Sequence, residues 1–127
     1  MELVGIRYYS ARFDDVSQDN FFVVLKKMGF KLVTKPLKII KVGSTVRERK
    51  ANFDVEIALD AYLLRQKYST LVLFSGDSDL DYLVRLLRGR RKKVIVVSTR
   101  YHISKELIWS CDKYIDLRKL RSYIERF

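Results

Sequence analysis

The sequence predicts an α/β domain of three layers, in which helices cover both faces of a mostly parallel sheet. Residues 71–74 and 94–97 are short continuous apolar runs, the pattern of parallel strands that are buried on both faces. Between them, apolar residues recur at helical spacing, and such alternation of strands and helices is typical of a parallel sheet. A length of 127 residues indicates a single domain, residues 1–127, with a core of its own.

The first half of the chain predicts strand, helix, strand and then a long loop. Residues 3–9 and 30–34 have strand composition, and residues 17–28 have an apolar helical face, with Ser17 as N-cap and Gly29 after the last turn. That apolar face consists of Phe21, Val24, Leu25 and Met28. Residues 35–50 are mostly basic and include the only proline and Gly43, so we expect a long loop there.

The second half predicts four further helices that alternate with strands. Residues 51–67 have apolar side chains on more than one face, which predicts a largely buried helix, and residues 71–74 should form a central strand. Leu80, Leu83, Val84 and Leu87 mark a helix closed by Gly89. Residues 103–111, capped by Ser104 or Thr99, and residues 117–127 complete the helices, with a short edge strand at 114–115.

The charge points to a polyanionic partner. Lys and Arg number 26 against 15 Asp and Glu, which gives a net charge of +11 and favours nucleic acid. No apolar run approaches the roughly 18 residues of a membrane span, and no basic amphipathic segment begins the chain, so we expect no membrane partner. A single cysteine, Cys111, and no signal-peptide pattern predict a cytoplasmic protein without disulfides.

Two carboxylates follow the first buried strand directly. Asp77 and Asp79 come just after residues 71–74, with Gly76 permitting a tight turn between strand and helix. Functional groups of open parallel sheets gather at this carboxyl edge, and a hard cation such as Mg²⁺ needs only a few carboxylate oxygens besides water. Aspartate at a helix start is also an ordinary cap, so a purely structural role for this pair stays open.

Asp54 lies at the start of another predicted helix and could meet the same edge. Two acidic helix starts that converge provide the ligands for metal-assisted hydrolysis of a phosphodiester. The alternative role for Asp54 is again that of an N-cap. Asp60, six residues later and about 600° around the helix, lies on another face and is assigned a structural role.

These residues resemble the NYN family of the PIN-like nuclease superfamily. The matching segments cover most of the chain: Arg7-Tyr-Tyr-Ser10, Lys50-x-x-x-Asp54-Val-x-x-Ala58-x-Asp60, Ser75-Gly-Asp-Ser-Asp79 with Leu83-Val84, and Ser104-x-x-Leu107 followed by Asp112. The resemblance implies a Rossmann-like (PIN-like) fold and an endoribonuclease activity that depends on Mg²⁺ or Mn²⁺. It assigns Asp54, Asp77 and Asp79 to the metal and Ser75 to a polar position beside them.

The chain departs from the family pattern at its beginning. Members open with a strand that ends in an aspartate near an asparagine, followed by a helix, and this sequence has neither. The resemblance implies that this strand is central and lies beside residues 71–74. Repacking could close the resulting gap, but our hypothesis is that an upstream segment, a second copy of the chain or another partner supplies a strand.

Basic and aromatic residues near the predicted site are candidates for binding RNA, single-stranded or structured. In the loop, Lys41, Arg47, Arg49 and Lys50 precede Asp54 and could guide phosphates. The second basic cluster, at 88–93, is interpreted as a solvated helix end. Aromatic candidates for stacking on bases are Tyr8, Tyr9, Phe13, Tyr101 and His102. Trp109 and Cys111 are interpreted as packing residues, and one histidine with one cysteine cannot form a zinc site.

Two other function classes remain open. The first is a module of the same fold that binds nucleic acid but has lost its metal chemistry, because the first acidic strand is missing. The second is a haloacid-dehalogenase-like phosphatase. Asp77-x-Asp79 resembles the nucleophile loop of that family, although in this chain Ser75-Gly76 separates the two aspartates from the preceding strand.

Overall fold

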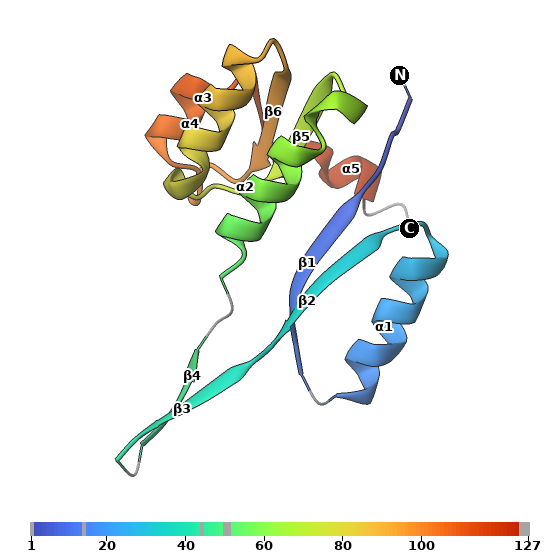
Figure 1. Ribbon diagram of the computed structural model, residues 1–127, viewed down its shortest axis with the longest axis vertical. Coiled ribbons are helices and arrows are strands. Elements are labelled where there is room, and N and C mark those ends of the chain that lie inside the picture. Colours follow the sequence, from blue (N-terminus) through green and yellow to red (C-terminus); the bar gives the residue numbers. More distant parts are fainter. Residues whose placement is uncertain (1, 14, 44, 50–51, 125–127) are drawn as a thin grey trace. The chain divides into compact units, whose positions relative to one another are not determined.

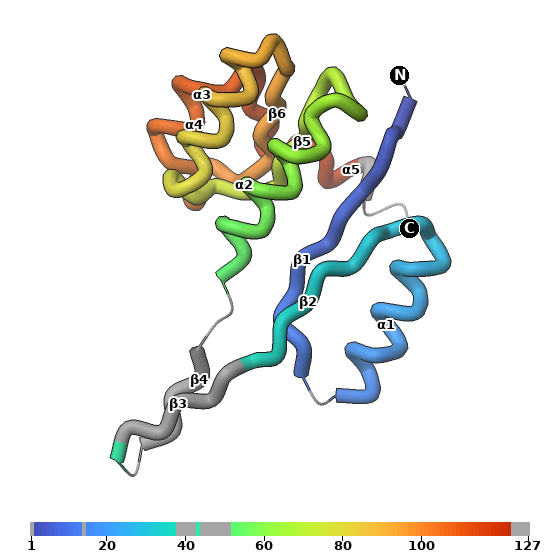
Figure 2. Tube along the Cα trace, viewed as in Figure 1, coloured from blue at the N-terminus to red at the C-terminus, as the bar shows by residue number. Residues whose placement is uncertain are grey.

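The computed structural model describes residues 2–13, 15–43, 45–49 and 52–124. These fall into two compact units, Met1–Ile57 and Ala58–Phe127, which are treated separately below (Figures 1 and 2). The elements are helices and strands connected largely in alternation, and three of the four strand pairs among the described residues are parallel. The predicted α/β class is therefore confirmed. In the described residues, no helix is long and apolar enough to cross a membrane.

The first unit is built on two parallel strands joined by a helix. Strand β1 (Arg7–Arg12) pairs with β2 (Lys31–Pro36), and α1 (Val16–Lys27) forms the connection between them. The N-cap of α1 is Asp15 and not Ser17 as predicted, because the Asp15 carboxylate accepts the backbone N–H of Ser17 at 2.9 Å. Gly29, with φ of 94°, ends the helix as expected.

The buried face of α1 differs from the predicted one. Phe22 and Leu25 are buried, while Phe21, Val24 and Met28 are exposed. Phe21 instead packs edge to face against Tyr8 of β1, with ring centroids 6.0 Å apart. Both Phe21 and Phe22 can continue the helical apolar pattern, so spacing alone could not place the seam between helix and sheet.

The predicted loop after β2 contains a β-hairpin. Strands β3 (Lys38–Val42) and β4 (Thr45–Arg49) are antiparallel, and Lys38 pairs with Arg49. Gly43, with φ of 64°, provides the left-handed backbone that the turn requires. The prediction of a loop was wrong because abundant lysine and arginine masked the β-branched residues of both strands.

Helix α2 (Asp54–Leu63) is shorter and less buried than the predicted helix over 51–67. It is followed by a 3₁₀ helix (Arg65–Lys67), and Ala61 is its one buried residue. Val55, Leu59 and Leu63, spaced by four residues, form an exposed apolar stripe. The prediction of a largely buried helix was therefore wrong.

The second unit contains a three-stranded parallel sheet. Its order is β5 (Thr70–Phe74), β6 (Lys93–Ser98) and β7 (Lys113–Asp116), connected by α3 (Asp81–Gly89) and α4 (Lys105–Ser110). The 3₁₀ helix Ser78–Leu80 leads into α3. As predicted, the apolar side chains that mark α3 and β6 are buried in the core, and Leu107 of α4 joins them. The predicted core residues are Leu80, Leu83, Val84, Leu87, Val94 and Val96.

Strand β5 lies at the edge of its sheet, which corrects the expected central position. Among the described strands it pairs only with β6. Leu73 is buried, but Val72 and Phe74, which point to the other face, are 48% and 68% exposed. The continuous apolar run therefore indicates a strand with two apolar faces, of which one is uncovered.

The end of the chain combines confirmed and corrected expectations. Ser104 caps α4 by accepting the Leu107 N–H at 3.2 Å, and α5 (Arg121–Ile124) follows the 3₁₀ helix Leu117–Leu120. Cys111 is buried as predicted, and this burial raises the pKa of its thiol. Trp109, in contrast, is 79% exposed and is not a packing residue.

Candidate metal centre

The loop after β5 is ordered by its own polar side chains. Ser75 Oγ accepts the backbone N–H of Asp77 at 3.2 Å. One carboxylate oxygen of Asp77 in turn accepts the N–H of Asp79 at 2.9 Å and caps the 3₁₀ helix that begins at Ser78. The capping role considered for this motif is therefore present, in Asp77, and it leaves the second oxygen of that carboxylate for another partner.

Gly76 fixes the position of this loop against the loop that follows β6. A Cβ atom at Gly76 would lie 2.2 Å from the carbonyl oxygen of His102 and 2.8 Å from Ser98 Oγ. The Gly76 carbonyl accepts the N–H of Ser104 at 3.0 Å. Glycine is required here by lack of space for a side chain, whereas the sequence suggested the need for a tight turn.

Asp54 is the first residue of α2, and its backbone is held by neighbouring groups. Its N–H donates to the side-chain oxygen of Asn52 at 2.8 Å. Lys35 of β2 donates to the Asn52 carbonyl at 3.0 Å and forms an ion pair with Glu56. This lysine hydrogen bond is the main cause that lowers the pKa of Glu56.

Phe53, the residue before Asp54, is buried between an aromatic ring and a cation. Its ring centroid lies 6.1 Å from that of Tyr9 and 5.0 Å from the ammonium group of Lys35. A cation above an aromatic face is an attractive arrangement. The start of α2 is therefore anchored to β1 and β2 by packing as well as by hydrogen bonds.

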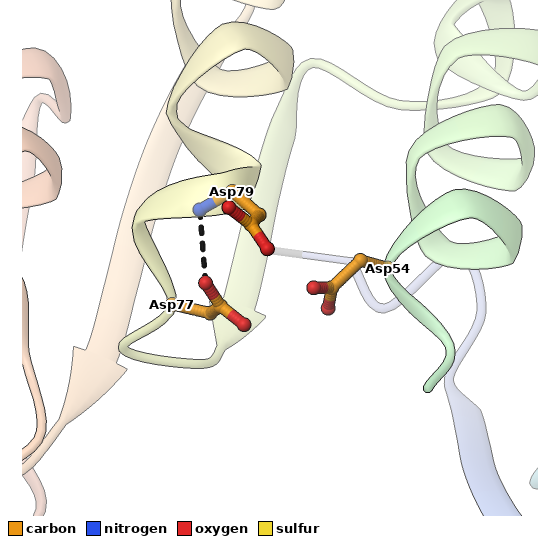
Figure 3. Close-up of side chains that lie close together, drawn as sticks. All are labelled: Asp54, Asp77 and Asp79. Carbon is orange, nitrogen blue, oxygen red and sulfur yellow. Dashed lines mark hydrogen bonds between the residues drawn. The ribbon is translucent and has the colours of Figure 1, made fainter. Parts of the chain in front are cut away.

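Asp54, Asp77 and Asp79 form a compact group of carboxylates (Figure 3). One oxygen of each lies within 4.8 Å of the others; Asp54 is half-buried, and Asp77 and Asp79 are exposed. Hard divalent cations prefer this all-oxygen donor set, and exposure leaves space for the waters that Mg²⁺ retains. The donors therefore fit such an ion. Asp60, assigned to another face of the helix, is not in the group.

Of the residues predicted to bind nucleic acid, the structure describes the side chain of only some. Tyr8 is 36% exposed, and its ring packs on that of Phe21. Lys41, Arg47 and Arg49 lie on the β3–β4 hairpin, whose side chains fall outside the description, and Lys50 lies outside the described residues altogether. Their proposed contact with phosphates stays a prediction.

A cationic and aromatic cluster at the carboxyl edge of the β5–β6–β7 sheet was only partly anticipated. Tyr101, which follows β6, is 72% exposed, and the guanidinium groups of Arg100 and Arg118 lie 4.8 and 5.6 Å from its ring centroid. Asp116 orients Arg118 through an ion pair of 3.3 Å. Because these residues directly follow β6 and β7, the rule that selected Asp77 also applies to Arg100 and Arg118.

Comparison with known proteins assigns the family. The model of the NYN domain family matches residues 1–119. The chain belongs to the NYN domain family. This NYN chain is 37% identical to the low amplitude and bright protein LabA of Synechococcus elongatus, over 99% of its own length and 69% of LabA.

A solved structure supports the same assignment. The NYN chain resembles a protein of unknown function from Vibrio parahaemolyticus with a TM-score of 0.77 and 30% identity, over 91% of this chain and 70% of the other. The suspected resemblance and the α/β PIN-like fold are therefore confirmed. NYN domains are generally nucleases, and this member has an acidic aspartate group of the kind that a divalent metal could use.

Proposed function

We propose that this NYN domain is an endoribonuclease that depends on Mg²⁺ or Mn²⁺. The observation that carries the proposal is the convergence of Asp54, Asp77 and Asp79 within 4.8 Å. Three carboxylates held this close repel one another, and a divalent cation would remove that repulsion. Family membership adds support, because NYN domains are generally nucleases.

Each residue of the site has a distinct task in this proposal. Asp54, Asp79 and the second oxygen of Asp77 hold the cation, while Ser75 orients Asp77 through its backbone N–H. When bound, the cation supplies a more acidic water and a positive charge beside the scissile phosphate. Because Asp77 and Asp79 are exposed, a phosphodiester backbone can approach the group from solvent.

RNA is the proposed substrate, and its bases have a place to bind. Tyr101, between Arg100 and Arg118, offers an exposed aromatic ring at the edge of the sheet where β6 and β7 end. Stacking of unpaired bases on such rings contributes about 1–3 kcal/mol per base in single-strand binders. Preference for a single-stranded substrate follows from this feature.

The decisive experiment compares cleavage of single-stranded RNA with Mn²⁺ or Mg²⁺ and with EDTA. We expect Asp54→Asn, Asp77→Asn and Asp79→Asn each to lower metal-dependent cleavage by more than the roughly 10–100-fold that outer-shell changes produce. Asp19→Asn, on the exposed first turn of α1, is the matched control and should cleave like the wild type. Equal cleavage by all four variants, or cleavage that persists in EDTA, would contradict the proposal.

A second candidate is a nucleic-acid-binding module that requires an added strand for catalysis. The specific observation is the uncovered β5, which among the described strands pairs only with β6 and exposes Val72 and Phe74. A strand supplied by another segment or another copy could pair with this edge. RNA binding without any metal-dependent difference between the wild type and Asp77→Asn would favour this candidate.

A further inference from the structure

Cations gather at the amino-terminal edge of the β5–β6–β7 sheet, where the chain enters β5 and β6. We call Lys67, Arg90, Arg91 and Lys93, all of them exposed, the basic edge. The two segments that carry them are joined, because the Lys93 N–H donates to the Ser69 carbonyl at 3.0 Å. The ammonium group of Lys92 also donates to the Tyr68 carbonyl, at 2.9 Å.

The structural needs of this region are met by other groups. Arg88 donates to the Ser110 carbonyl at 2.8 Å and pairs with Asp112 at 3.1 Å. The last carbonyls of α3 accept backbone N–H groups from the three residues that follow the helix. Within the described residues, no side chain of the basic edge makes an ion pair or a hydrogen bond. Arg88 is therefore engaged at the helix end, whereas the side chains of the basic edge remain in contact with solvent and are available to a ligand.

Arg91 adds an independent observation. It is the one non-glycine residue with positive φ, 64°, in the described part of the chain. The N–H of the next residue reaches back to the Leu87 carbonyl, as in helix ends where glycine is the usual choice. The predicted glycine, Gly89, instead ends the helix itself. An arginine kept in a conformation that favours glycine indicates a use for its charge.

We propose that the basic edge is a second contact surface for RNA phosphates. It lies at the opposite ends of the strands from Asp77 and Asp79, and the five residues of β5 separate the two by about 17 Å. Residues 65–69 and 89–93 contribute no exposed large apolar side chain, whereas a membrane surface favours apolar residues among the cations. This inference takes its choice of RNA from the proposed function, and it predicts that a long RNA contacts both edges.

The test is RNA binding in EDTA, which does not require cleavage. The variant Arg91→Gly/Lys93→Gln should lower the slope of log affinity against log salt by about 1.4, a loss of about 25-fold at 0.1 M salt. Arg91→Gly alone should weaken binding and yet raise the melting temperature, because glycine fits the left-handed conformation. The matched control is Lys26→Gln/Lys27→Gln, which removes two exposed cations from the end of α1.

The outcomes separate this inference from the proposed nuclease. A reduced slope in the double variant, with the control unchanged, supports the basic edge even where cleavage fails. An unchanged slope, or an equal loss in the control, overturns it even where cleavage is intact. Loss of binding to vesicles of acidic lipid without loss of RNA binding would also overturn it, since it would make lipid the partner.

Discussion

At the residue scale, Gly76 has the narrowest tolerance in the site. Its missing Cβ would overlap the backbone of His102, which cannot move as a flexible side-chain end could. We expect Gly76→Ala to lower the free energy of unfolding by about 1–3 kcal/mol, as overpacking does, and to displace Asp77. Denaturant unfolding measures the effect. Gly89→Ala, where nothing lies within 4 Å, is the control and should be neutral or stabilising.

Asp77 has two roles that substitutions can separate. Asparagine also caps helices, so Asp77→Asn should keep the hydrogen bond to the Asp79 N–H while it removes one charge from the group. We expect its melting temperature to rise slightly in metal-free buffer because repulsion falls. Asp77→Ala should instead lose about 1 kcal/mol with the cap. A lower melting temperature for Asp77→Asn would show that repulsion among the three carboxylates is negligible.

The sequence was most informative about residues whose position follows from a strand end. Asp77 and Asp79 could be selected because they follow an apolar run, and their proximity to Asp54 was expected from two acidic helix starts. Lys35, Asn52 and Glu56 were not anticipated, because their contacts join a strand to a distant helix. A pairwise contact of this kind leaves no periodic signal in one sequence.

At the element scale, the start of α2 depends on a pair with a defined pH response. The pKa of Glu56 is lowered by the Lys35 hydrogen bond and then by its own backbone N–H, so it lies below the reference value of 4.5 in the folded protein. The stability that ionised Glu56 contributes is therefore complete at pH values above 4.5, and it is lost as the pH falls through the pKa of Glu56 in the folded protein. Glu56→Gln should lower the melting temperature at neutral pH.

The control for this pair is another first-turn carboxylate. Glu106→Gln on α4 removes an acid that has no ion pair among the described residues. It should leave the melting temperature nearly unchanged across the same pH range. The difference between Glu56→Gln and the wild type should vanish in acid, and a constant difference down to the lowest pH would exclude the ionised pair as its cause.

Helical elements were predicted better in position than in orientation. α3 could be placed with its buried face because its apolar residues occupy a single stripe against polar neighbours. α1 and α2 carry apolar residues on several sides, such as Phe21 beside Phe22, so the side that packs depends on the neighbouring strands. Those strands are defined only by the complete fold.

At the scale of the whole molecule, cation binding should be linked to stability. A ligand that binds only the folded state at 100 times its dissociation constant stabilises by about 2.7 kcal/mol. For a chain of 127 residues this corresponds to a rise of about 10 °C in melting temperature. Mn²⁺ should produce such a rise in the wild type but not in Asp79→Asn, as measured by thermal unfolding. An equal rise in both would place the ion elsewhere.

The class of fold could be predicted from the sequence, whereas the pairing of its strands could not. Alternating apolar strands and helices, together with the motif from Ser75 to Asp79, are local signals and were sufficient for the family. The edge position of β5 and the hairpin of β3 and β4 depend on which strands pair, which is a property of the assembled chain. The single domain expected from length stays a prediction beside the two compact units.

Trp109 determines how these experiments are best observed. It is the only tryptophan of the chain, and its indole is already in contact with water in the folded state. Intrinsic fluorescence should therefore change little in emission maximum when the protein melts, and circular dichroism is the better probe of unfolding. The same exposure makes that fluorophore a sensitive reporter of any macromolecule that covers the outer face of α4.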